Sequence, residues 1–73
     1  MKQQLEKRVA LAIKQIMLAM NQNIEDTGEI LAEFDTSHSD AECEQSKQYK
    51  ALVTCHFALK EALERINNQL NKK

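Results

Sequence analysis

The sequence of 73 residues contains no proline and only one glycine, Gly28. Proline and glycine mark turns and strand ends, so their scarcity argues against a fold of many short strands. Alanine, leucine, glutamate, lysine and glutamine dominate instead, and these residues favour helices. The composition therefore predicts an all-α fold.

Aromatic residues and long apolar runs are also scarce. Tryptophan is absent, and the few aromatic side chains leave little material for a ligand pocket or a base-stacking platform. No apolar stretch is longer than that from Val9 to Ile13, which is far below the roughly 20 residues that cross a bilayer, and the N-terminus lacks the apolar region of a signal peptide. We expect a cytoplasmic protein that binds no cofactor and does not enter a membrane.

Apolar residues recur at the spacing of one helix face in both halves of the chain. Steps of four and three alternate in the first half at Ile13, Met17, Met20, Ile24, Thr27, Leu31 and Phe34. The same steps relate Tyr49, Leu52, His56, Leu59, Leu63, Ile66 and Leu70 in the second half. This heptad spacing is typical of helices that pack at a shallow angle.

The pattern predicts one domain, residues 1–73, with a helix over 3–35, a loop over 36–39 and a second helix over 40–71. Gly28 costs its helix about 1 kcal/mol relative to alanine, but the apolar stripe keeps its phase beyond it, so we favour an unbroken first helix. Ser39 and Glu42 have the spacing of a capping box at the start of the second helix. Equal helices with a short connection form an antiparallel, coiled-coil-like hairpin. So small a hairpin should be completed by a partner or by dimerisation into a four-helix bundle.

Charge is distributed unevenly along the predicted hairpin. Residues 1–20 contain four bases and one acid, residues 21–46 contain eight acids and no base, and residues 47–73 contain six bases and two acids. The turn end is therefore acidic and the open end basic, which gives the hairpin a preferred orientation toward partners or copies of itself. No dense basic patch is present, so we do not expect nucleic acid as the main partner.

No constellation of residues predicts catalysis or metal binding. Cys55 and His56 are adjacent, and neighbouring helical residues point about 100° apart, which does not suit a nucleophile and its base. Cys43, Cys55 and the two histidines lack the spacing of metal ligands. Twelve positions in one helix separate the two cysteines by about 18 Å, so we expect reduced thiols. The sequence therefore predicts a protein that is not an enzyme.

Four apolar residues lie off the predicted seam between the helices. Leu11 and Leu18 are one heptad apart on the opposite side of the first helix, and Val53 and Phe57 form a second strip on the second helix. Single exposed apolar residues are ordinary, but a thin hairpin has nothing of its own to cover such strips. We predict that these four residues bind a protein partner.

The second predicted helix resembles that of a known family. The segment from Lys47 to Tyr49 and the run from Ala58 to Leu63 are similar to the small E-type co-chaperones of type III secretion needle proteins, the YscE-like family. The chain length, the two-helix plan and the early pair Leu5 and Glu6 agree with this resemblance. It implies a cytoplasmic co-chaperone that binds a larger tetratricopeptide-like chaperone and helps to keep a needle subunit unpolymerised before export. The alternative is a homodimeric four-helix-bundle regulator or adaptor, with RNA as a candidate ligand.

Overall fold

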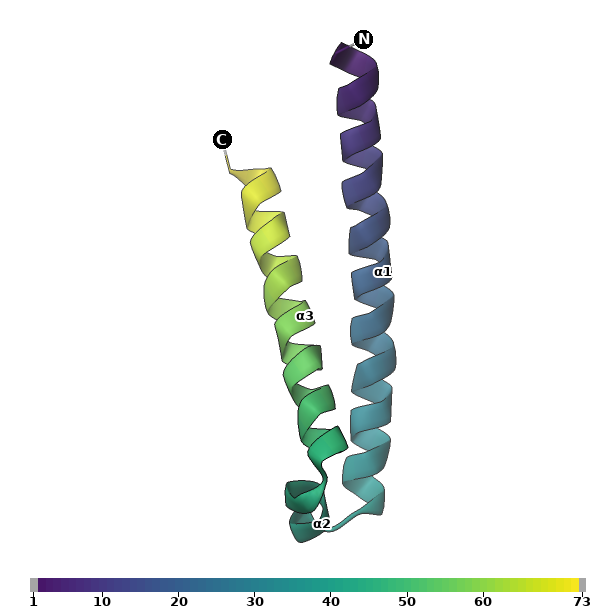
Figure 1. Ribbon diagram of the computed structural model, residues 1–73, viewed down its shortest axis with the longest axis vertical. Coiled ribbons are helices and arrows are strands. Elements are labelled where there is room, and N and C mark those ends of the chain that lie inside the picture. The colour runs from purple at the N-terminus through teal and green to yellow at the C-terminus, as the bar shows by residue number, and fades with distance from the viewer. Residues whose placement is uncertain (1, 73) are drawn as a thin grey trace.

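The computed structural model describes residues 2–72 and is an antiparallel helical hairpin (Figure 1). Helix α1 spans Lys2–Ser37, helix α2 spans Asp40–Gln45 and helix α3 spans Lys47–Asn71. No strand occurs within residues 2–72. The prediction of an all-α hairpin is confirmed, and so is the continuity of the first helix through Gly28.

The turn is built by a capping box at Ser39. The backbone N–H of Ser39 donates to Glu42 Oε1 at 2.9 Å, and the backbone N–H of Glu42 donates to Ser39 Oγ at 3.2 Å. These bonds satisfy amides that the start of a helix otherwise leaves without partners. Helix α2 therefore begins at Asp40, where the sequence pattern placed the start of the second helix.

The second helix is not continuous over 40–71 as predicted, because it breaks at Ser46. The Ser46 backbone is extended (φ −82°, ψ 108°), and its N–H donates to the carbonyls of Glu42 and Cys43. Its hydroxyl accepts the N–H of Tyr49 at 3.1 Å. Ser46 thus ends α2 and caps α3, a role that serine performs well because its side chain competes for backbone hydrogen bonds.

An aromatic stack closes the hairpin at the turn end. The Phe34 ring lies between His38, at 3.8 Å between ring centroids, and Tyr49, at 4.7 Å. Cys43 of α2 lies beside it, and this residue, 8% exposed, is the only buried one among residues 2–72. The turn is therefore the best packed part of the molecule.

Halfway along the seam, a polar contact replaces apolar packing. The Thr27 hydroxyl donates to the carbonyl of Asn23 at 2.8 Å and lies 2.7 Å from His56 Nδ1. The Thr27 hydroxyl therefore links α1 to α3 through a hydrogen bond with the His56 ring. The helices also approach each other at the adjacent Gly28, where a Cβ would lie 3.4 Å from His56 Cε1.

The helices diverge from the turn toward the open end (Figure 1). The whole hairpin measures 57 × 20 × 16 Å, and the predicted stripe residues from Ile13 to Phe34 are only half-buried. Helix α1 also extends beyond the end of α3, because it has 36 residues and α3 has 25. The structure therefore has a seam but almost no enclosed core.

Candidate protein-binding surface

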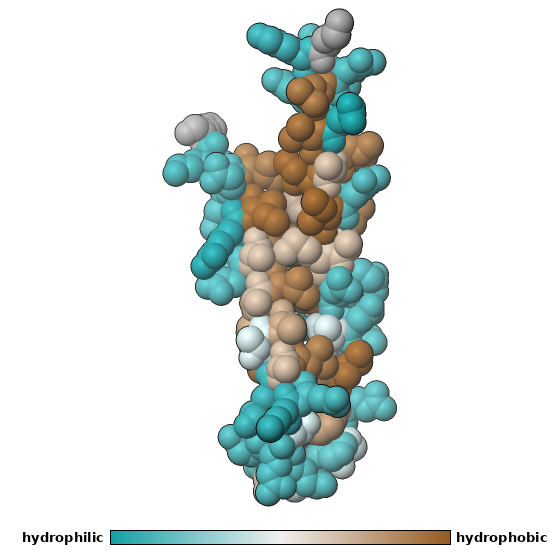
Figure 2. Space-filling view, in the orientation of Figure 1, coloured by the Kyte–Doolittle hydropathy of each residue, from teal (hydrophilic) through white to brown (hydrophobic). Residues whose placement is uncertain are grey.

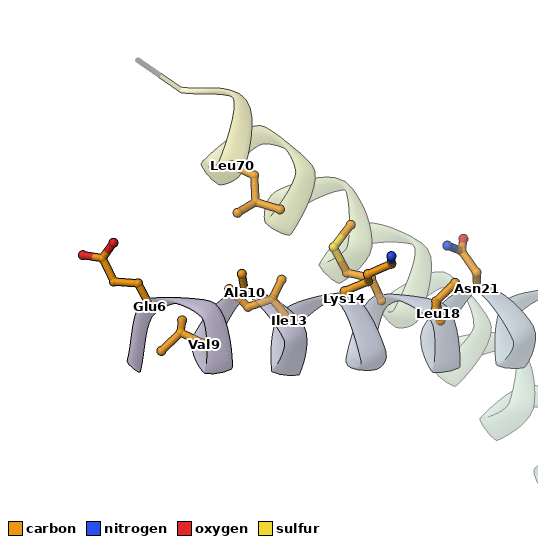
Figure 3. Close-up of a pocket in the computed structure, with 9 residues that line it drawn as sticks. Glu6, Val9, Ala10, Ile13, Lys14, Leu18, Asn21 and Leu70 are labelled. Atoms are coloured by element: carbon orange, nitrogen blue, oxygen red, sulfur yellow. The ribbon is translucent and has the colours of Figure 1, made fainter. Parts of the chain in front are cut away.

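The diverging helices leave an apolar groove at the open end (Figure 3). Leu70 of α3 faces α1 across this groove, and the wall on α1 includes Val9, Ile13 and Leu18. The groove has a volume of about 560 Å³, and its remaining lining residues are Glu6, Ala10, Lys14, Met17 and Asn21. It is open to solvent and lies between helices, which is the geometry in which a helix or an apolar side chain of a partner docks.

A second groove of about 340 Å³ is lined by Ile13, Ile16, Ile66 and Leu70, with Arg65 and Gln69. Ile13 and Leu70 belong to both grooves and separate them. Leu70, in the last turn of α3, thus lies level with Ile13 of α1. Residues 2–9 of α1 consequently lie beyond the last turn of α3.

The second groove is part of a larger surface, here called the apolar face, that runs from the open end along one side of the hairpin and stops before the hydrophilic turn end (Figure 2). Its large members are between 51% and 59% exposed, and they are Leu5, Val9, Ile16, Ile30 and Leu70. Small side chains at helical spacing continue it on both helices, at Ala12, Ala19, Ala51, Cys55, Ala58 and Ala62. Apolar atoms therefore extend from the open end along both helices.

Two apolar rows on α1 explain this surface. One row, from Ile13 to Phe34, faces α3 and is half-buried. The other occupies positions 5, 9, 12, 16, 19, 23, 26 and 30, again in alternating steps of four and three. It is apolar except at Asn23 and Asp26, and it lies about 100° around the helix from the first. A helix with two such rows has the pattern of one that contacts two neighbouring helices, and this chain supplies only one of them.

The predicted partner-binding residues do not form one surface. Leu11, Leu18 and Phe57 are 54%, 60% and 60% exposed, whereas Val53 is half-buried. The contact between Thr27 and His56 places the strip of Val53 and Phe57 about nine residues, or about 14 Å, along the hairpin from Leu18. The structure thus holds two separate strips, and neither belongs to the apolar face.

The sequence contains a signal for the apolar face, but a single stripe on each helix does not reveal it. The two predicted stripes place Leu70 at the seam and give no role to Leu5, Val9, Ile16 or Ile30. The alternating spacing of the second row, extended to Ile30, would have separated it from the seam.

The cysteines differ in environment. Cys43 lies in α2 and Cys55 in α3, rather than in one helix as expected, and both are free thiols. Burial raises the pKa of the Cys43 thiol, and the nearby carboxylates of Asp35 and Asp40 raise it further. Cys55 is exposed on the apolar face. Cys43 is therefore a packing residue held in its neutral form.

Ionisable groups are dispersed over the part of the chain that the structure describes. No three His, Cys, Asp or Glu side chains among residues 2–72 are placed to hold a metal ion. One ion pair joins Arg65 to Glu61 at 3.5 Å, one helical turn apart and largely exposed. Such a pair contributes little to stability. The outstanding feature of the described chain is its uncovered apolar surface.

None of the helices in residues 2–72 combines the length and the hydropathy that a membrane crossing requires. Comparison of the chain with family models, curated proteins and solved structures gives no match.

Proposed function

We propose that the chain is a co-chaperone that binds a larger, tetratricopeptide-like chaperone, and through it helps to keep a type III secretion needle subunit unpolymerised. The observation that carries the binding role is the contrast, within residues 2–72, between one buried residue, Cys43, and eight large apolar side chains that are more than half exposed. Covering such side chains stabilises a complex by roughly 25 cal/mol per Å² before the costs of association.

The resemblance of the second half of the chain to the YscE-like family supports the identity of the partner. A tetratricopeptide-like chaperone is itself built of antiparallel helix pairs, so its surface offers helices against which a hairpin can pack. The exposed strips at Leu11 and Leu18 and at Phe57 are the surfaces assigned to this contact, with Val53 contributing less because it is half-buried. In this role the hairpin binds and stabilises, and it catalyses no reaction.

The test is co-expression of the chain with a tetratricopeptide-like chaperone encoded beside a type III secretion needle subunit. Size-exclusion chromatography with light scattering should then show a defined heterocomplex. Leu18→Glu and Phe57→Glu should each weaken it, because each substitution puts a charge into an apolar contact. Gln48→Glu, at an exposed polar position of α3, is the matched control and should leave the complex intact.

Two results would contradict the proposal. A chain that never co-elutes with the candidate chaperone lacks the partner assigned to it. A complex that survives both Leu18→Glu and Phe57→Glu uses another surface, and the assignment of the strips would then be wrong.

A further inference from the structure

The hairpin exposes much more surface than an ordinary monomer of its mass. Its accessible surface is 6405 Å². A compact monomer of 8.4 kDa exposes about 4,600 Å², so the excess is about 1,800 Å². Each partner in a standard protein complex covers about 800 Å². The excess surface is therefore large enough for one interface of standard size, and a similar area remains for a second interface.

The part of α1 beyond α3 has no cover within residues 2–72. Leu5 lies there, 59% exposed, because the last turn of α3 ends beside Ile13, and Val9, 51% exposed, meets α3 only at the groove that it lines with Leu70. A helix end with two large apolar side chains and so little contact has little to stabilise it. An occupant of the apolar face must reach this segment.

The second apolar row of α1 is complementary to itself when two copies run antiparallel. With a twofold axis between residues 17 and 18, Leu5 of one copy meets the partner's Ile30, and Ile16 meets the partner's Ala19. Large side chains thereby pair either with another large one or with a small one that leaves room for it. Val9 is the exception, because it meets the carboxylate of the partner's Asp26. Arg8, the neighbour of Val9 in the sequence, lies close to that carboxylate.

The charges of α1 match the same register. Its bases lie near the N-terminus, at Lys2, Lys7, Arg8 and Lys14, and its acids near the other end, at Glu25, Asp26, Glu29 and Glu33. The antiparallel register places Lys2 opposite the partner's Glu33, and it places Arg8 next to Val9, the residue opposite the partner's Asp26. A parallel arrangement would align acids with acids and bases with bases, which is unfavourable. The charge pattern therefore favours an antiparallel second copy.

Helix α3 provides the space that the projecting segment needs. Ala51, Cys55 and Ala58 follow one another at helical spacing on the apolar face, beside Ile30 of α1. Small side chains let a neighbouring helix approach closely. The projecting end of α1 from the second copy would lie over this stretch, and its own α3 ends before it could interfere.

We propose that the apolar face binds a second copy of this chain in an antiparallel, twofold-symmetric four-helix bundle centred on residues 17 and 18 of α1. Both α1 helices then contact α3 of their own chain through one apolar row and each other through the second. The strips at Leu11, Leu18 and Phe57 remain outside this interface. The inference concerns the chain alone and does not depend on the co-chaperone role.

The experiment measures the mass of the purified full chain by analytical ultracentrifugation over a range of concentrations. The wild type should be a dimer. Ile16→Glu places two charges near the twofold axis and should weaken dimerisation by about 100-fold or more. Leu18→Glu is the matched control, with the same substitution on the other side of the same helix, and should remain a dimer. A monomeric wild type at about 100 μM, or a dimer lost in Leu18→Glu and kept in Ile16→Glu, would overturn the proposal.

A charge exchange tests the register even if a dissociated hairpin loses helicity. Arg8→Glu and Asp26→Arg should each weaken the dimer, because each variant brings like charges together, and the double variant should restore wild-type affinity. A double variant as weak as the single ones would refute the antiparallel pairing of Arg8 with Asp26. Restored affinity with no heterocomplex would support the dimer and refute the co-chaperone function, so the two proposals fail separately.

Discussion

Replacing Gly28 with alanine should stabilise the hairpin, although Gly28 lies where the helices meet. Alanine favours a helix interior by about 1 kcal/mol over glycine. The backbone of Gly28 has no positive φ, so a Cβ introduces no strain there. That Cβ would lie 3.4 Å from His56 Cε1, at the lower limit of ordinary contact. The net gain should be about 0.5–1 kcal/mol, which corresponds to a Tm rise of about 2–8 °C for a domain of this size.

Thermal and urea denaturation followed by circular dichroism would measure the gain, with all variants at one protein concentration because association also raises Tm. Gly28→Leu is the comparison, since leucine has a helix propensity close to that of alanine but a much larger side chain. It should displace His56 from Thr27 and destabilise the hairpin. Equal stabilisation by alanine and leucine would show that the helices do not approach at Gly28. Destabilisation by alanine of more than about 1 kcal/mol would show a tighter contact than 3.4 Å.

Three further predictions concern the caps and the thiols. Ser46→Ala should cost about 1 kcal/mol in urea denaturation, because it removes the hydroxyl that caps α3; no change would mean that the break needs no cap. A thiol reagent at neutral pH should label Cys55 well before Cys43, whose burial raises the pKa of its thiol; equal rates followed by mass spectrometry would contradict this packing. Hydrogen bonds from the backbone and side chain of Ser39 lower the pKa of Glu42, so the stabilisation is present above its unfolded pKa and lost as pH falls through the folded one. The stability difference between wild type and Glu42→Gln should therefore disappear in an acid titration, and a difference that persists at pH 2 would refute the role of the carboxylate.

The apolar spacing predicted the helices and their seam, because two helices with one apolar stripe each can shield both stripes from water only by packing the stripes against each other. Residues from Ile13 to Phe34 lie half-buried against α3 as that spacing requires. The break at Ser46 could not be predicted in this way. The stripe keeps its phase across it, and a serine cap competes with the helix by only about 1 kcal/mol.

The binding surface was predictable only in part. Leu11, Leu18 and Phe57 are exposed as their positions on the helix indicate, but Val53 lies about 40° nearer the seam than Phe57 and is half-buried. The apolar face could not be recognised from one stripe. It depends on where α3 ends relative to α1, and that register is set by the turn.

The near absence of a buried core has a consequence for genetics. In most domains, a survey of all single substitutions chiefly detects damaged packing, and this obscures the residues that contact other molecules. Here Cys43 is the only described residue whose side chain is enclosed by its own chain. Positions outside the seam that tolerate no charge in such a survey would therefore mark intermolecular contacts. A selection in cells would thus identify the contact residues of this hairpin before any partner was purified.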